Sequence, residues 1–326
     1  LEARLARGVL VPASALWRGG MAARAAAYAR GWLSVRDLPL PSVSVGNLTL
    51  GGSGKGAVAD WIATHYAAGG FPPAILVPGA TDDVLVHRHA VPGAVVLGDA
   101  DPVAGAERAL AQGATVVILD DAYQRLDVQR DLNLAVLSAE TSRAVRWTLP
   151  AGPWREGWRA LARAGAAIIT RKRAPHDAAQ ALAADLAAAV QGPVAIVHLG
   201  LRHLEGLVSG ERREAASLSG KRVVAASGIA DPDAFVAQTK ATGAAVQVAT
   251  WKDRAEFRDE DVAWLAHAAR RADHVVITEK DAVKLRDRWP HRVPEPLVAV
   301  LDLSWEAGED ELTAALDAVV TPADRF

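Results

Sequence analysis

A glycine-rich segment containing one lysine carries the strongest chemical signal in the sequence. It reads Gly46-Asn47-Leu48-Thr49-Leu50-Gly51-Gly52-Ser53-Gly54-Lys55-Gly56, follows an apolar run at 41–45 and precedes a segment from 57 that can continue as a helix. A strand, a glycine-rich turn and a helix in this order point backbone N–H groups, the positive end of the helix dipole and the lysine ammonium at one volume. That volume suits a chain of phosphates, and the predicted phosphate-binding residues are Gly51, Gly52, Ser53, Gly54, Lys55 and Gly56.

Two positions depart from the usual P-loop spelling. Thr49 stands where a glycine is expected five residues before Gly54, and Gly56 stands where a hydroxyl after the lysine would hold Mg²⁺. A glycine-rich turn with a solvated lysine is therefore an alternative interpretation of this segment alone.

Two adjacent carboxylates form the second candidate site. Asp120 and Asp121 follow the apolar run 115–119, which is the Walker B arrangement, in which a carboxylate binds Mg²⁺ beside the phosphates. A helix cap or a turn is the plainer interpretation of such a strand end. The glycine-rich segment upstream favours the metal-binding interpretation.

Composition sets broad limits on the class of protein. The 326 residues suffice for two α/β domains, the formal net charge is -2, and there is no cysteine for a disulfide, a thiolate metal site or a thiol nucleophile. No global basic excess indicates nucleic acid as a partner. We expect neither a membrane-spanning segment nor a signal peptide.

The elements that must position these residues alternate between strand and helix. Apolar runs predict strands at 74–77, 94–97, 115–119, 132–137 and 166–170, and a second series at 222–226, 244–249, 274–278 and 297–301. The alternation predicts a parallel sheet with helices on both faces. We expect a P-loop domain over 37–192 and a smaller α/β domain over 193–326, whose closing helix at 309–320 could pack on the first.

Residues 1–36 form a separate region that is basic and partly apolar. Arginines alternate there with leucine, tryptophan and tyrosine, and acids stand only at its margins. Such a helix can lie in an anionic membrane interface. A first helix packed on the domain, with a solvated arginine face, is the equally weighted alternative.

Five segments taken together resemble a known family. Residues 45–55, 118–125, 149–156, 227–232 and 277–285 are similar, in order, to segments of the tetraacyldisaccharide 4'-kinases of lipid A biosynthesis. Thr49 is normal in that family. The resemblance implies two α/β domains with the active site in the cleft between them, ATP and Mg²⁺ as cofactors, and peripheral attachment to the cytoplasmic face of the bacterial inner membrane.

The resemblance also implies roles for single residues. Lys55 would meet the β- and γ-phosphates, and Asp121 and Gln124 would serve the Mg²⁺ site with Asp120 beside them. Asn47 and Glu156 would lie near the substrate, a lipid A precursor. The family's catalytic Asp stands in a Gly-Asp-Glu-Pro motif, which we match to 81–84, so that Asp82 becomes the candidate base.

Three departures from the family pattern bear on catalysis. The family's His, partner of the base, falls at Arg254, which cannot accept a proton near neutral pH. The loop after Val77 is shortened, and Gly56 lacks a hydroxyl. His87 and His89 lie near Asp82, but we interpret both as solvated positions in a loop or on a helix surface.

Three functions remain open at this point. The favoured one is transfer of the γ-phosphate of ATP to the 4'-hydroxyl of a tetraacyldisaccharide 1-phosphate. The alternative is an impaired homologue that binds nucleotide or lipid without efficient transfer. An unrelated P-loop NTPase would leave the other four segments unexplained.

Overall fold

The computed structural model describes residues 2–79, 81–141 and 146–321, and within these ranges the side chains from residue 10 onward. The chain forms two compact units, one made of residues 1–197 with 305–326 and the other of residues 198–304. The strands β7 (Val194–Gly206) and β12 (Leu297–Ala307) carry the chain from one unit to the other.

The first unit contains a parallel sheet in the order β6-β5-β1-β4-β2-β3. Its strands are β1 (Ser42–Gly46), β2 (Pro73–Pro78), β3 (Val95–Asp99), β4 (Val116–Asp120), β5 (Leu132–Ser138) and β6 (Ala166–Arg171). All residues of β1 and β4 are buried, as apolar runs in the middle of a parallel sheet require. The registers place Val45 beside Asp120 and Gly46 beside Ala135, so β1 and β4 end next to each other while β5 continues to Ser138.

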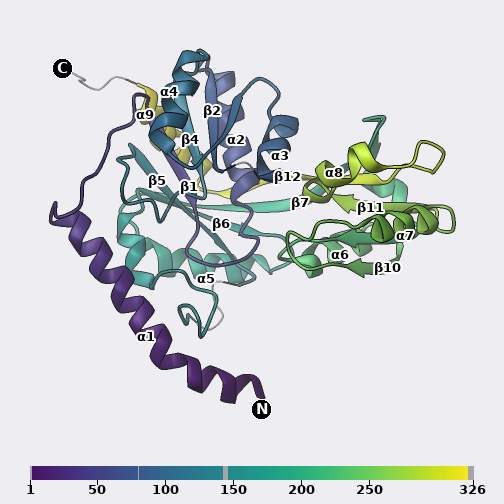
Figure 1. Cartoon of the computed structure of the whole chain (residues 1–326), viewed down its shortest axis with the longest axis horizontal. Coiled ribbons are helices and arrows are strands. Elements are labelled where there is room, and N and C mark those ends of the chain that lie inside the picture. Colours follow the sequence, from purple (N-terminus) through teal and green to yellow (C-terminus); the bar gives the residue numbers. More distant parts are fainter. Residues whose placement is uncertain (1, 80, 142–145, 322–326) are drawn as a thin grey trace. The chain divides into compact units, whose positions relative to one another are not determined.

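The helices of the first unit close its core. They are α2 (Lys55–Ala68), α3 (Asp82–Ala90), α4 (Pro102–Ala111), α5 (His176–Ala187) and α9 (Glu309–Val320), with a short 3₁₀ turn η1 (Trp158–Arg163). Figure 1 shows α2 and α4 alongside β2 and β4, and α5 packs on β6. Alternate residues of β2 and β4, including Leu76 and Leu119, pack with Ala106 and Ala109 of α4 in one apolar cluster.

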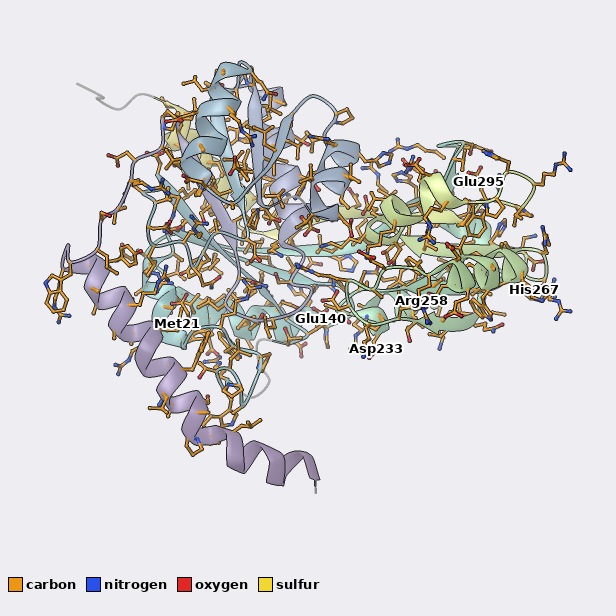
Figure 2. The ribbon with its side chains drawn as sticks, in the orientation of Figure 1. Met21, Glu140, Asp233, Arg258, His267 and Glu295 are labelled. Atoms are coloured by element: carbon orange, nitrogen blue, oxygen red, sulfur yellow. The ribbon has the colours of Figure 1, made fainter. Side chains whose placement is uncertain are left out.

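The N-terminal helix α1 (Glu2–Ala29) belongs to the first unit and contains Pro12. Ser14 hydrogen-bonds Thr148, and the Trp17 indole donates to the Arg155 carbonyl at 2.8 Å, so α1 is anchored on the loop 148–155. Its exposed apolar side chains include Leu16, which is 78% accessible, while Met21 (Figure 2) is half-buried. Among the helices that the structure describes, none is long and apolar enough to cross a bilayer.

The second unit is a smaller α/β sheet. Its order is β10-β9-β11-β12-β7, with β8 (Arg212–Glu214) antiparallel to β7. The parallel strands β9 (Arg222–Ser227), β10 (Ala245–Thr250) and β11 (His274–Thr278) alternate with α6 (Pro232–Ala241), α7 (Asp259–Ala269) and α8 (Glu279–Leu285). The short turns η2 (Ala215–Leu218) and η3 (Arg286–Arg288) complete it. Two apolar clusters, one around Ile277 and one around Val276, form its core.

The predicted α/β fold with a P-loop-type parallel sheet is confirmed. The extent of the second unit differs from the expected 193–326, because the compact unit covers only 198–304. β12 returns the chain to the first unit, where α9 packs on β1 and β5. The sequence had left open whether the closing helix at 309–320 packs on the first domain.

Candidate functional site

The glycine-rich segment forms a loop between β1 and α2, as predicted. Gly51 and Gly54 have φ angles of 115° and 77°, values in the left-handed region that side chains other than glycine rarely adopt. Gly54 is the N-cap of α2, and Lys55 is its first residue. The first N–H groups of a helix lack partners within the helix, so this loop presents donors and an ammonium together.

Thr49 has a structural reason to differ from glycine. Its backbone forms an antiparallel bridge with Trp154, and the flanking hydrogen bonds join Leu50 N to Pro153 O and Arg155 N to Leu48 O, both at 2.7 Å. The segment 48–50 is thus joined to the proline-rich loop 148–156 by an isolated bridge and its flanking hydrogen bonds. Thr49 is buried in this pairing, and the positive φ falls at Gly51 instead.

Residues at the end of β6 and just after β5 and β6 hold the loop by hydrogen bonds. Thr170 Oγ1 donates to the Ser53 carbonyl at 2.7 Å, and Lys172 Nζ donates to the Gly52 carbonyl at 3.0 Å. Glu140, labelled in Figure 2, accepts hydrogen bonds from the backbone N–H groups of 172–174 and so fixes the segment that carries Lys172. These contacts fix the orientation of the loop carbonyls. Because a carbonyl and the following N–H group belong to the same peptide plane, they also fix the direction of the N–H groups.

Asn47 lies at the foot of the loop and is almost fully buried. Its amide nitrogen donates to Ser53 Oγ at 3.0 Å, and its backbone carbonyl accepts from Gln124 Nε2 at 2.9 Å. Its Oδ1 has no hydrogen-bond partner among the described residues. Burial of an unpaired acceptor is costly, and a ligand that donates to it would remove that cost.

The structure brings together the three residues predicted to serve a metal. Asp120 ends β4 beside Val45, and Asp121 follows it with a φ of 52°, which turns the chain sharply at the sheet edge. Arg155 binds the Asp121 carboxylate with two nitrogens, at 2.9 and 3.3 Å, and lies 3.3 Å from Gln124 Oε1. Asp121 and Gln124 therefore share one guanidinium, and the sequence did not single out Arg155 as their partner.

Glu156 lies in a buried ion pair. Arg163 Nη2 donates to both oxygens of its carboxylate, at 2.8 and 2.9 Å, while the guanidinium also lies over the Tyr123 ring at 5.1 Å from its centre. The carboxylate is 4% exposed. Glu156 thus positions the loop that holds Arg155 in addition to any contact with a substrate.

One of the two histidines near Asp82 differs from the expectation. Asp82 is exposed at the first residue of α3, and His89 is exposed on the same helix. His87, in contrast, is 2% exposed, so its interpretation as a solvated residue was wrong. Val84 and His87 are both buried on one face of α3. The spacing of three residues between the valine and the histidine was the sequence signal that could have predicted the burial of His87.

His87 lies between two carboxylates. Its Nδ1 is 2.5 Å from Asp60 Oδ1 and its Nε2 is 3.6 Å from Asp120 Oδ2. Burial lowers the pKa of the imidazole, but its interactions with the Asp120 and Asp60 carboxylates outweigh the effect of burial and raise the pKa to about 10. The ring is therefore a cation at neutral pH.

A second aspartate at a strand end was missed by the sequence reading. Asp99 is the last residue of β3, and the run Gly98-Asp99-Ala100-Asp101-Pro102 contains a Gly-Asp pair shortly before a proline. Its carboxylate pairs with Arg108 at 2.9 Å and accepts from the Asp101 N–H. The ends of strands in a parallel sheet are where ligands bind. The helix α4 that follows, with Asp101 as its N-cap and Pro102 as its first residue, is the sequence signal that marks this position.

Three predicted segments of the second unit converge at the ends of its parallel strands. The buried Asp281 carboxylate accepts from the Gly228 N–H at 3.2 Å, and Arg254 N donates to the Gly228 carbonyl at 3.0 Å. Lys284 Nζ donates to the Ala255 carbonyl. Arg254 is exposed with a φ of 59°, so the segment 251–257 forms a tight turn held on the loop after β9.

Comparison with known proteins assigns the chain to a family. The family model described as "Tetraacyldisaccharide-1-P 4'-kinase" (LpxK) matches residues 6–81 and 79–321. A "Tetraacyldisaccharide 4'-kinase" of Geobacter sulfurreducens is 32% identical, with 98% of this chain and 95% of the relative covered. One of Anaeromyxobacter sp. is 34% identical, with 97% and 92% covered.

A solved structure shares the fold. The crystal structure of LpxK from Aquifex aeolicus in complex with ATP, called the "apo" form, superimposes with a TM-score of 0.75 at 22% sequence identity. It covers 97% of this chain and 99% of that one. The family match over nearly the whole length and the identities of these relatives lead to one conclusion: the chain belongs to the tetraacyldisaccharide-1-P 4'-kinase family of kinases.

Proposed function

We propose that this protein transfers the γ-phosphate of ATP to the 4'-hydroxyl of a tetraacyldisaccharide 1-phosphate, a lipid A precursor. The observation that carries the proposal is the register of β1 on β4, which sets the glycine-rich loop beside Asp120 and Asp121. The names of the relatives support the acceptor, and the ATP of the Aquifex aeolicus structure supports the donor.

The residues at the end of β4 fit a magnesium ion that arrives with ATP. Carboxylate and amide oxygens are its preferred ligands, and it usually takes only one or two carboxylates from the protein with the rest from phosphates and water. Within the described ranges no three His, Asp or Glu side chains form a set that could hold a metal ion, so Asp121, Asp120 and Gln124 would act together with the nucleotide. When bound, the ion would neutralise charge on the phosphates.

The protein's own residues would act mainly by positioning. Lys55 and the first N–H groups of α2 would hold the β- and γ-phosphates as the bond to the bridging oxygen breaks and the bond from the 4'-oxygen to phosphorus forms. The proton of the hydroxyl would pass to a carboxylate. Asp82 remains our proposal for this base, and Asp99, at the end of β3, is the second candidate.

We also propose peripheral attachment to the cytoplasmic face of the inner membrane. α1 exposes Leu10, Leu16 and Trp17 and carries several arginines, a composition suited to an anionic interface. A lipid acceptor would be taken from that surface. The formal net charge of -2 shows no global basic excess that would call for nucleic acid as a partner.

A turnover assay tests the proposal. The purified protein is incubated with Mg-ATP and a tetraacyldisaccharide 1-phosphate in detergent micelles, and the bis-phosphorylated product is measured beside a Lys55→Ala variant. We expect product from the wild type alone. Binding of a fluorescent ATP analogue without any turnover would instead favour the impaired homologue, for which Gly56 and Arg254 are the sequence grounds.

The two candidate bases are separated by matched amide variants. Asp82→Asn and Asp99→Asn each remove one carboxylate with little change in size. The true base should lose about two to four decades of kcat with a small change in KM, and the other variant should stay near the wild type. Equal, small effects would exclude both residues.

A further inference from the structure

The His87 ring lies beside the first turn of α2, next to Gly56, where the sequence lacks a side chain. A Cβ on Gly56 would lie 3.7 Å from His87 Cε1, which is ordinary van der Waals contact. Asp60, the partner of Nδ1, is four residues after Gly56 and so projects from the same face of α2. A methyl group at position 56 would fit, whereas the two γ atoms of a threonine would extend toward the ring.

The other ring nitrogen faces the carboxylate at the end of β4. Asp120 is 4% exposed, and its Oδ2 is 3.6 Å from Nε2, a distance for an ion pair rather than a hydrogen bond. A P-loop usually has a hydroxyl side chain after its lysine, at the position of Gly56. Here the His87 ring occupies the space next to that position and places its Nε2 beside the same carboxylate.

We propose that His87, itself held by Asp60, positions the Asp120 carboxylate for the nucleotide site and so replaces a hydroxyl side chain at position 56. The inference rests on the proposed function for its nucleotide readout. His87 is a positioning residue in this account, because it acts on bound nucleotide through Asp120. An outer residue that fixes a ligating carboxylate typically affects metal affinity by about 10 to 100-fold when it is changed.

Two amide variants separate this role from simple packing. In His87→Gln the amide nitrogen can reach the position of Nε2 and donate toward Asp120, whereas in His87→Asn it can reach only the position of Nδ1 and donate toward Asp60. The dissociation constant of a fluorescent ATP analogue is measured with Mg²⁺ and with a chelator. Thermal unfolding of each variant shows that it is folded.

The expected result is specific to one variant and one condition. With Mg²⁺ the affinity of His87→Asn should fall about tenfold or more, while His87→Gln stays within about threefold of the wild type. With the chelator both variants should bind as the wild type does, through Lys55 and the loop. Equal losses in the two variants, or losses that do not depend on Mg²⁺, would overturn the role of His87.

A second measurement needs no nucleotide. Gly56→Thr should lower the midpoint of thermal unfolding by about 2 to 10 °C, and Gly56→Ala, the matched control, should not lower it. In a His87→Ala background the effect of the threonine should largely disappear, since the ring it meets is gone. Additive effects would show that the space beside Gly56 is not filled by His87.

The failure of the proposed function is distinguishable from the failure of this inference. If the wild type shows no saturable binding that Lys55→Ala removes, the proposed function fails and the nucleotide role of His87 fails with it. If the wild type binds normally but the Asn and Gln variants behave alike, only the role of His87 is overturned.

Discussion

Glu140 offers a prediction whose size can be worked out from the structure. Its Oε1 accepts the N–H groups of Lys172, Arg173 and Ala174 at 2.7 to 3.0 Å, and its Oε2 accepts from Ser138 Oγ at 2.6 Å. Burial, the largest influence, raises the pKa of this carboxyl, but the four hydrogen bonds together outweigh it and hold the pKa at about 2. The folded state therefore favours the ionised form.

The shift translates into unfolding free energy. A pKa lowered from 4.5 to about 2 corresponds to about 3 kcal/mol, which we reduce to about 2 kcal/mol because the carboxylate is partly exposed. Since the folded pKa is depressed, this stability is present above pH 4.5 and is lost as the pH falls toward 2. Glu140→Gln keeps one acceptor oxygen but no charge, so it should cost about 1 to 2 kcal/mol at pH 7.

Urea unfolding followed by tryptophan fluorescence measures the effect. Wild type and Glu140→Gln are compared at pH 7, 5, 4 and 3, with Glu107→Gln on the exposed face of α4 as the control. The gap between wild type and Glu140→Gln should narrow below pH 4.5, while Glu107→Gln should stay within about 0.5 kcal/mol of the wild type throughout. A gap that is the same at pH 7 and pH 3 would refute the assignment of the stability to the charge of Glu140.

Three further changes have defined outcomes. Gly46→Ala would place a Cβ 2.7 Å from both the Cβ and the backbone nitrogen of Tyr123. We expect urea unfolding to show that the free energy of unfolding falls by about 2 kcal/mol or more. An unchanged unfolding midpoint would contradict this close packing. Burial raises the pKa of Asp281 above 3.8 despite its hydrogen bonds, so the wild type should lose unfolding free energy as the pH rises through that raised pKa. The Asp281→Asn variant should not lose unfolding free energy in this pH range. If the unfolding free energies of wild type and variant change in parallel with pH, the reasoning is disproved. The variant Trp17→Ala, on α1, should weaken binding to anionic lipid vesicles about tenfold. Trp147→Ala changes a tryptophan that is also exposed but lies outside α1, and it should not weaken this binding. Equal binding by the two variants would argue against α1 as the membrane contact.

Features that depend on local sequence could be predicted from it. A strand, glycines at the turning positions and a helix were enough to predict the loop 46–56. An apolar run that ends at a carboxylate was enough to predict the position of Asp120. Parallel pairing then brings both to one sheet edge, because every strand of such a sheet ends on the same side. The family resemblance supplied the same positions independently.

Features that depend on contacts between distant segments could not be predicted. Arg155 meets Asp121 across 34 residues, and His87 meets Asp60 across 27, through packing that no periodicity encodes. A histidine among charged neighbours has the composition of a solvated helix face, so the interpretation of His87 failed on local sequence. Its burial follows from α3 packing against α2, where the missing side chain of Gly56 leaves room.

The last helix of the first unit has a consequence for how the chain is made. α9 packs on β1 and β5 through the buried Leu312 and Leu316, and the Tyr66 hydroxyl donates to the Leu316 carbonyl. A ribosome therefore releases the glycine-rich loop, Asp120 and Asp121 well before it synthesises the helix that packs on the strand preceding the loop. During that interval the first unit lacks the apolar side chains of Leu312 and Leu316. Synthesis that stops after residue 304 would yield a chain with the whole candidate site but an open core, a ready substrate for chaperones and proteases.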